Sequence, residues 1–223
     1  MERGWTLRAF FGFRQTRNRT LVQKIALSGI MLGLVLLAQF CERFMPIFAY
    51  MKINFSLVFI LPVFYFAGWY FGLLLLVLRG ILGTLIDSFT LATLIGHAIL
   101  LFVETLLVLL MYLYSFVFRN VVNHNLKMLF IILATLVSIC FLASYLNATL
   151  FLPIYLFYYG ITSSPTLAAA ISVFDQISPF YFGIPNYWAG TLVAYWVGNF
   201  CKFGLVFTLY FPLAKILRGY YAG

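Results

Sequence analysis

The chain has very few charged residues. Only 9% of its 223 residues are Asp, Glu, Lys or Arg, and 65% are hydrophobic. An average soluble domain has roughly 25% charged residues, so this shortage excludes an ordinary soluble protein and indicates an integral membrane protein. The chain accommodates about six helices of ~20 residues with short loops. No room remains for a separate soluble domain of ordinary size, such as an ATPase.

Cysteine and the familiar catalytic motifs are also scarce. The three cysteines, Cys41, Cys140 and Cys201, are far apart and form no CxxC, so neither a metal site nor a disulfide framework is predicted. The sequence contains no HExxH, no GxSxG and no phosphate-binding P-loop. We therefore expect a protein that is not an enzyme and that holds no metal or cofactor.

Acidic residues are rarer than basic ones, which gives a net charge of +9. Six basic residues lie near the N-terminus: Arg3, Arg8, Arg14, Arg17, Arg19 and Lys24. Basic residues that cluster near helix ends are typical of a protein held against an anionic cytoplasmic leaflet, rather than of one that binds nucleic acid. We interpret residues 1–20 as a basic cytoplasmic or interfacial segment and 21–223 as a single membrane domain.

Long apolar runs predict six membrane spans. They lie at about 21–40, 55–66, 70–86, 96–118, 128–150 and 189–213. The second is short and is bounded by Pro46 and Gly68. Only helices and closed barrels satisfy their backbone groups in lipid, so runs of this kind predict an all-α membrane protein.

The distribution of Lys and Arg predicts the orientation. Arg43 and Lys52 fall on the side opposite the N-terminus, whereas most basic residues outside the spans fall on the N-terminal side. This excess places both termini in the cytoplasm. It also places a long segment, about 151–188, outside. There, Pro165 and its neighbours predict a short capped helix. This segment is either a lid or an ordinary loop.

Lys202 lies inside the last predicted span, with Asn199 three residues before it on the same helical face. An ammonium near mid-membrane costs roughly 2.5–3.5 kcal/mol on insertion scales, so it indicates a partner or a function. The alternative is that Lys202 snorkels to the headgroups and Asn199 joins two helices. Arg79 also lies deep in a span, and Glu104 is its nearest plausible counter-charge.

Small residues form a stripe on the first span, at Ala26, Gly29 and Gly33. Such stripes let another helix approach closely. The approaching helix belongs either to a partner protein or to this chain itself.

Four segments in a shared order resemble one protein family. They are 50–56, 71–72, 146–155 and 199–204. Together they resemble the substrate-binding S components of the energy-coupling factor (ECF) vitamin transporters, and most of all the riboflavin-specific branch. His97 stands where that branch often has glutamate, and Asn54 stands where an aspartate is common.

The resemblance implies a mechanism and a set of site residues. An S component captures its vitamin from outside and docks on a membrane T component driven by two cytoplasmic ATPases, here in a prokaryotic plasma membrane. The residues that it implies for the vitamin are Asn54, His97, Asn147, Tyr155, Asn199 and Lys202. The stripe of Ala26, Gly29 and Gly33 would dock on the T component.

Riboflavin is the first choice of ligand, and three alternatives stay open. Another S component would take folate, thiamine or a nucleobase-like compound. A membrane-embedded, lipid-modifying enzyme would use His97, Glu104 and Asp87. A structural subunit of a larger assembly would bind no ligand.

Overall fold

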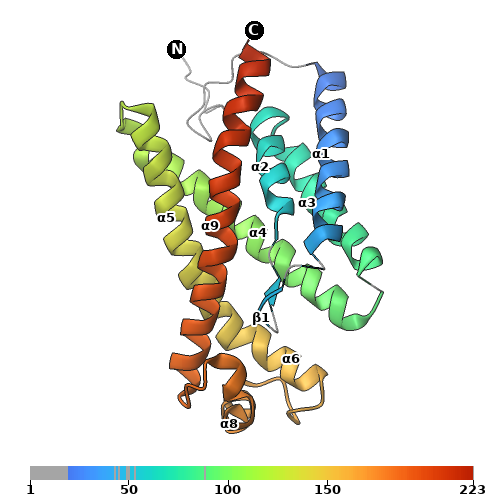
Figure 1. The fold of residues 1–223 in the computed structure, drawn as a ribbon, viewed down its shortest axis with the longest axis vertical. Helices are drawn as coiled ribbons and strands as arrows, with labels where there is room; N and C mark the ends of the chain where they lie inside the picture. Colours follow the sequence, from blue (N-terminus) through green and yellow to red (C-terminus); the bar gives the residue numbers. More distant parts are fainter. Residues whose placement is uncertain are drawn as a thin grey trace, which may run out of the picture.

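The computed structural model describes residues 20–42, 44, 46–48, 51–52, 54–87 and 89–222, most of which are helical (Figure 1). The longer helices are α1 (Leu21–Glu42), α2 (Ser56–Phe66), α3 (Trp69–Ile86), α4 (Leu91–Val117), α5 (His124–Leu146) and α9 (Tyr187–Ala222). The short antiparallel strands β1 (Pro46–Phe48) and β2 (Met51–Lys52) form a hairpin between α1 and α2. The predicted basic segment 1–20 lies, except for Thr20, outside the described residues.

Five of the described helical segments are long and apolar enough to cross a membrane. They are Leu21–Glu42, Trp69–Ile86, Leu91–Asn120, Leu126–Tyr158 and Tyr187–Leu213. The chain therefore has the architecture of a helical, multi-pass membrane protein. In Figure 1, α1 begins and α9 ends at the same end of the bundle, and α6 and α8 lie at the opposite end.

The second predicted span differs from the others. Helix α2 has 11 residues, which at about 1.5 Å per residue cover roughly 16 Å, about half the ~30 Å hydrocarbon core of a bilayer. Most of its side chains are buried, and it packs against α1, α3 and α9. A helix that is hydrophobic all round suits a site surrounded by other helices, so α2 is a central, protein-enclosed helix.

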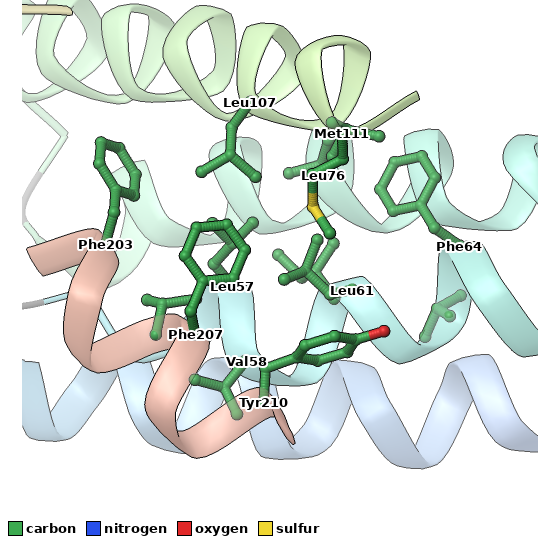
Figure 2. Close-up of a cluster of buried hydrophobic side chains, with 14 of the residues drawn as sticks. Leu57, Val58, Leu61, Phe64, Leu76, Leu107, Met111, Phe203, Phe207 and Tyr210 are labelled. Carbon is green, nitrogen blue, oxygen red and sulfur yellow. The ribbon is translucent and has the colours of Figure 1, made fainter. Parts of the chain in front are cut away.

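The apolar core forms around α2. Figure 2 shows Leu57, Val58, Leu61 and Phe64 of α2 facing side chains from α3, α4 and α9. The partners are Leu76, Leu107, Met111, Phe203, Phe207 and Tyr210. The turn that leads from α2 into α3 passes through Gly68 at φ 105°, a conformation that side-chain-bearing residues rarely adopt.

The predicted outer segment is folded. A π-helical turn, η3 (Asn147–Phe151), carries α5 into α6 (Leu152–Tyr158), so the fifth predicted span continues to Tyr158. Then follow α7 (Leu167–Ser172), α8 (Phe174–Ile177) and η4 (Ser178–Tyr181). The predicted capped helix is confirmed: the Thr166 hydroxyl accepts a hydrogen bond from the Ala169 backbone N–H at the start of α7.

We call residues 152–186 the cap. It has its own apolar cluster, in which Phe174 and Tyr181 pack against Tyr187 and Tyr195 of α9. The hydroxyls of Tyr181 and Tyr195 lie 3.1 Å apart. Burial raises the pKa of the Tyr181 phenol, and the hydrogen bond to Tyr195 lowers it by less. Tyr181 is therefore neutral at physiological pH, as its position between packed rings requires.

Candidate functional site

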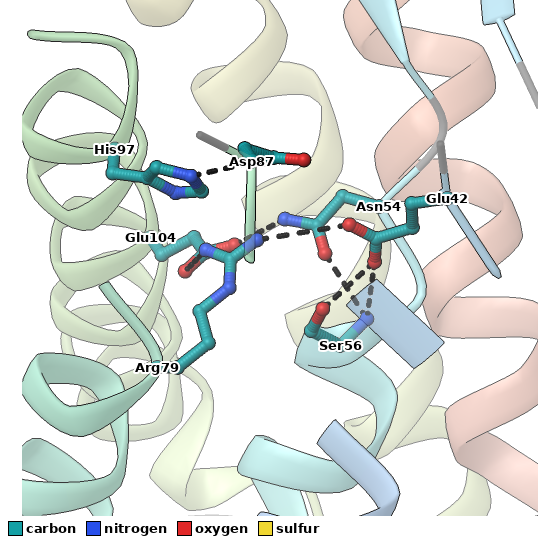
Figure 3. A network of polar contacts seen from close by, with 7 residues as sticks. All are labelled: Glu42, Asn54, Ser56, Arg79, Asp87, His97 and Glu104. Carbon is teal, nitrogen blue, oxygen red and sulfur yellow. Dashed lines mark hydrogen bonds and ion pairs between the residues drawn. The ribbon is translucent and has the colours of Figure 1, made fainter. Parts of the chain in front are cut away.

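Arg79 is the centre of a buried polar cluster (Figure 3). Its Nη1 donates to Glu104 Oε2 at 2.8 Å, which confirms the pairing expected from the sequence. On the other side, its Nη2 lies 3.9 Å from Glu42 Oε2. All three residues are buried. A charge buried in this way needs its partner, since removing one member of such a pair typically costs about 3–5 kcal/mol.

Asn54 and Ser56 join the two carboxylates to the start of α2. The Asn54 amide donates to Glu104, and its carbonyl accepts from the Ser56 N–H at 3.0 Å. Glu42 Oε1 accepts from both the Ser56 N–H, at 3.0 Å, and the Ser56 hydroxyl, at 2.7 Å. A carboxylate at a helix N-terminus satisfies free N–H groups and suits the helix dipole. We call Glu42, Asn54, Ser56, Arg79 and Glu104 the polar cluster.

Lys202 turns into the protein beside this cluster. Its side chain is buried, and it interacts electrostatically with Glu104, Arg79 and Glu42. Its Nζ also lies 5.2 Å from the centre of the Phe203 ring. The alternative in which Lys202 snorkels to the headgroups is therefore wrong. Asn199, one turn earlier, is buried as well, and its Nδ2 has no hydrogen-bond partner among the described residues.

His97 and Asp87 form a pair near the polar cluster. His97 Nε2 lies 3.2 Å from Asp87 Oδ2. A proton on Nε2 satisfies the carboxylate, and this tautomer is assigned from the hydrogen bond. His97 Nδ1 then has no partner among the described residues. His97 and Glu104 share one face of α4 but bind different partners, so they do not form an acid–base pair with each other.

Gln39 of α1 is a further buried polar residue, and sequence reasoning missed it. Both of its side-chain amide atoms lack hydrogen-bond partners among the described residues. A Cβ added at Gly83 would lie 1.8 Å from Gln39 Nε2 and 2.8 Å from His97 Cε1. The missing side chain at Gly83 is therefore what lets Gln39 and His97 approach α3.

Glu42 was not among the site residues predicted from the sequence either, although the sequence pattern of α1 indicates it. Gln39 and Glu42 are three residues apart near the end of an apolar span, so they share a helical face. The same face carries buried Leu27, Met31 and Val35. Two polar residues that continue an apolar stripe indicate an interior polar site rather than a solvated helix end.

The two remaining predicted site residues, Tyr155 and Asn147, have contacts of their own. The Tyr155 hydroxyl approaches α4 at Gly96, where an added Cβ would meet it at 3.1 Å, so Tyr155 is beside the residue that precedes His97. The Asn147 amide donates to the Ala143 carbonyl of its own helix at 2.7 Å. The next residue, Ala148, accepts from the Tyr187 hydroxyl near the start of α9. No described contact joins Asn147 to Lys202, and their common site stays a prediction.

The small-residue stripe lies on the outer surface of α1. Ala26, Gly29 and Gly33 are exposed, and a Cβ built at either glycine would meet nothing within 4 Å. The stripe therefore does not pack against the described helices of this chain. Whether a partner protein covers this face stays a prediction.

The arrangement is suited to binding. Arg79 and Lys202 balance Glu42 and Glu104 in charge. Gln39 lies one turn before Glu42 and Asn199 one turn before Lys202, and amide atoms of both lack hydrogen-bond partners among the described residues. Among the described residues, no three His, Cys, Asp or Glu side chains are grouped so that they could hold a metal ion. The chemistry on offer is hydrogen bonding in a water-poor interior.

Comparison with known proteins gives one relative. The chain is 25% identical over 204 residues to a Mycoplasma pneumoniae protein described as "Uncharacterized protein MG350.1 homolog", and the match covers 88% of each chain. No family model matches the chain. No solved structure matches it either.

Proposed function

We propose that this chain is the substrate-binding S component of an ECF-type vitamin importer in a prokaryotic plasma membrane. The observation that carries the proposal is the burial of Asn199 and Lys202 on one face of α9, beside the polar cluster. A buried lysine and an unpartnered buried amide are costly to maintain in an apolar bundle, so their retention favours recognition of a polar ligand.

The placement of the other candidate residues supports this proposal. Asn54 lies between α1 and α2 and bonds to Glu104, while the Tyr155 hydroxyl approaches α4 at Gly96, the residue before His97. With Asn199 and Lys202, the candidate residues come from the first loop, from α4 and α6, and from α9, which is compatible with the resemblance to S components.

The ligand in this proposal is a flat, partly polar vitamin, with riboflavin first and folate or thiamine as alternatives. Fixed amides and charges in a dry site discriminate strongly, because a mismatched ligand leaves them unpaired. The chain also has 26 Phe, 15 Tyr and 4 Trp, which offer aromatic surface to a flat ring.

The proposed topology has six helical crossings, with both termini in the cytoplasm and the cap outside. The excess of Lys and Arg on the N-terminal side supports it, and so does the position of the start of α1 and the end of α9 at one end of the bundle. With α2 enclosed by protein, its short length is compatible with this topology.

The partners are a membrane T component and two cytoplasmic ATPases. The exposed stripe of Ala26, Gly29 and Gly33 on α1 supports docking, because a smooth helix surface allows a second helix to approach closely. The sequence contains no P-loop of its own, so the energy for uptake comes from those partners.

Two measurements test the proposal. Mass spectrometry of the purified protein should identify a bound vitamin, and a yellow, fluorescent preparation would indicate riboflavin. Membrane vesicles containing this chain should concentrate the vitamin only when the T component, the ATPases and ATP are present. Concentrative uptake by the chain alone would refute the proposal and indicate a secondary carrier. Turnover of a lipid would instead favour the enzyme with His97, Glu104 and Asp87.

A further inference from the structure

We infer that the site binds a neutral ligand by an edge of ring carbonyls, and that α1 and α3 contribute to this recognition through Gln39 and Arg79. The inference rests on the proposed function, since it names the ligand chemistry of that same site. Its basis is the balance between hydrogen-bond donors and acceptors that the polar cluster leaves unused.

The acceptors of the polar cluster are mostly occupied. Both carboxylate oxygens of Glu104 accept hydrogen bonds, one from Arg79 and one from Asn54. Glu42 Oε1 accepts two from Ser56, and the Asn54 carbonyl accepts one from the Ser56 N–H. A ligand that presents donors would have to compete with these internal bonds.

Buried donors, in contrast, remain. Arg79 Nε and Nη2, Gln39 Nε2 and Asn199 Nδ2 have no hydrogen-bond partner among the described residues. These three residues are 1%, 2% and 3% exposed, so bulk solvent does not reach them. The acceptors without a hydrogen bond are fewer, namely Gln39 Oε1 and His97 Nδ1, together with Glu42 Oε2, which makes only the 3.9 Å contact with Arg79 Nη2. The complementary edge of the ligand therefore presents mainly hydrogen-bond acceptors. It can also carry one N–H, which would donate to one of the protein's unpartnered acceptors.

The charges of the site favour a neutral edge over a carboxylate. Arg79 and Lys202 carry two positive charges, and Glu42 and Glu104 carry two negative ones, so the four charges cancel. Asp87 beside His97 adds one more carboxylate and no cation. An anionic ligand would have no excess cation to pair with in the interior, and burying an unpaired charge is strongly unfavourable. A cyclic imide is uncharged, and its two carbonyl acceptors flank one N–H donor. It therefore matches both the charge of the site and the excess of unused donors.

Four probes test this chemistry on the purified full-length chain. Riboflavin and lumichrome share a neutral ring imide, folate carries carboxylates, and thiamine is a cation. A bound ligand raises the melting temperature according to its concentration and Kd. Both imide compounds should raise it, and thiamine should not. Stabilisation by thiamine or folate alone would overturn the inference but leave a vitamin-binding role. Stabilisation by no probe would overturn both the inference and the proposed function.

Variants of α1 test whether Gln39 is a recognition residue. Gln39→Leu removes the donor at similar volume, and Gln39→Glu replaces it with a carboxylate. We expect the Kd for riboflavin to rise about tenfold in the first, as for a lost buried hydrogen bond, and further in the second. The matched control is Gln23→Leu, at an exposed position of the same helix, whose Kd should equal that of the wild type.

A second pair of variants acts on the same contact from α3. Gly83→Ala places a methyl group where Gln39 Nε2 lies, so Gln39 must move and riboflavin binding should weaken. Gly80→Ala, one turn away, meets nothing within 4 Å and should bind normally. Unchanged riboflavin isotherms in Gln39→Leu, Gln39→Glu and Gly83→Ala would overturn the assignment of α1 and α3 to the site.

Discussion

The apolar core around α2 and the polar cluster at its N-terminal end are equally buried, yet they differ in what they leave unsatisfied. In the core, Leu57, Leu61 and Leu107 are fully enclosed by apolar side chains (Figure 2). In the polar cluster, Arg79 bonds strongly to Glu104 and only distantly to Glu42 (Figure 3). Apolar packing has no direction, so it can be completed within one chain.

Hydrogen bonds and ion pairs have direction, and for this reason the polar cluster retains unused groups. A fold selected for stability alone would do as well with apolar side chains, because buried ion pairs are often replaceable without loss. The comparison therefore teaches that the core around α2 stabilises the bundle, while the proposed function assigns recognition to the polar cluster and the α9 face beside it.

The largest expected effect comes from breaking the centre of the polar cluster. Arg79→Met leaves two buried carboxylates without their shared cation, so the free energy of unfolding should fall by about 3–5 kcal/mol. Thermal unfolding in detergent or lipid nanodiscs measures this. Adding Glu104→Gln should recover part of the loss. If Arg79→Met alone is as stable as the wild type, the Arg79–Glu104 ion pair contributes nothing to the stability of the fold.

A truncation in the apolar core should lower stability almost as much, but it should not change vitamin affinity. Leu61→Ala opens a cavity against α4 and α9, and it should cost about 2–5 kcal/mol in unfolding free energy. The affinity of the folded fraction for the vitamin should stay unchanged, as isothermal titration would show. Leu37→Ala, at an exposed position on α1, is the control and should change stability by less than about 0.5 kcal/mol. A loss of vitamin affinity in the folded fraction of Leu61→Ala would contradict the division into a core that stabilises and a polar cluster that recognises the ligand.

The α9 face should show the opposite behaviour. Asn199→Ala or Lys202→Ala removes a group to which the proposed function assigns ligand recognition, so we expect vitamin affinity to fall at least about tenfold, the effect of one buried hydrogen bond. The chain should still fold, as size-exclusion chromatography and circular dichroism would show. Wild-type binding isotherms in both variants would place the ligand elsewhere.

The smallest effect on stability should come from the exposed stripe. Gly33→Leu adds a side chain where nothing lies within 4 Å, so unfolding and vitamin binding by the isolated chain should hardly change. Uptake by vesicles containing the T component and ATPases should nevertheless fall, because the helices can no longer approach closely. Val22→Leu, another exposed position on α1, is the control. Parallel losses of binding and uptake would mean that the stripe serves folding instead.

Several features of the site could be predicted from the sequence. Lys202 and Asn199 share a helical face in an apolar span, and the high cost of exposing them to lipid predicts that they face the interior. Arg79 needed a counter-charge, and Glu104 was available in the next span. Gln39 and Glu42 were not recognised, because near a helix end the sequence does not distinguish a solvated polar residue from a buried one.

The sequence by itself determined the class of this protein and its helical segments, because hydrophobicity and backbone hydrogen bonding in lipid act locally along the chain. It also determined that a few charges must be paired inside. Only the tertiary structure decided that α2 is enclosed, that Glu42 caps it, and that Gln39 reaches α3 at Gly83. These contacts depend on how helices distant in the sequence pack together, and that packing depends on the shapes of several side chains at once.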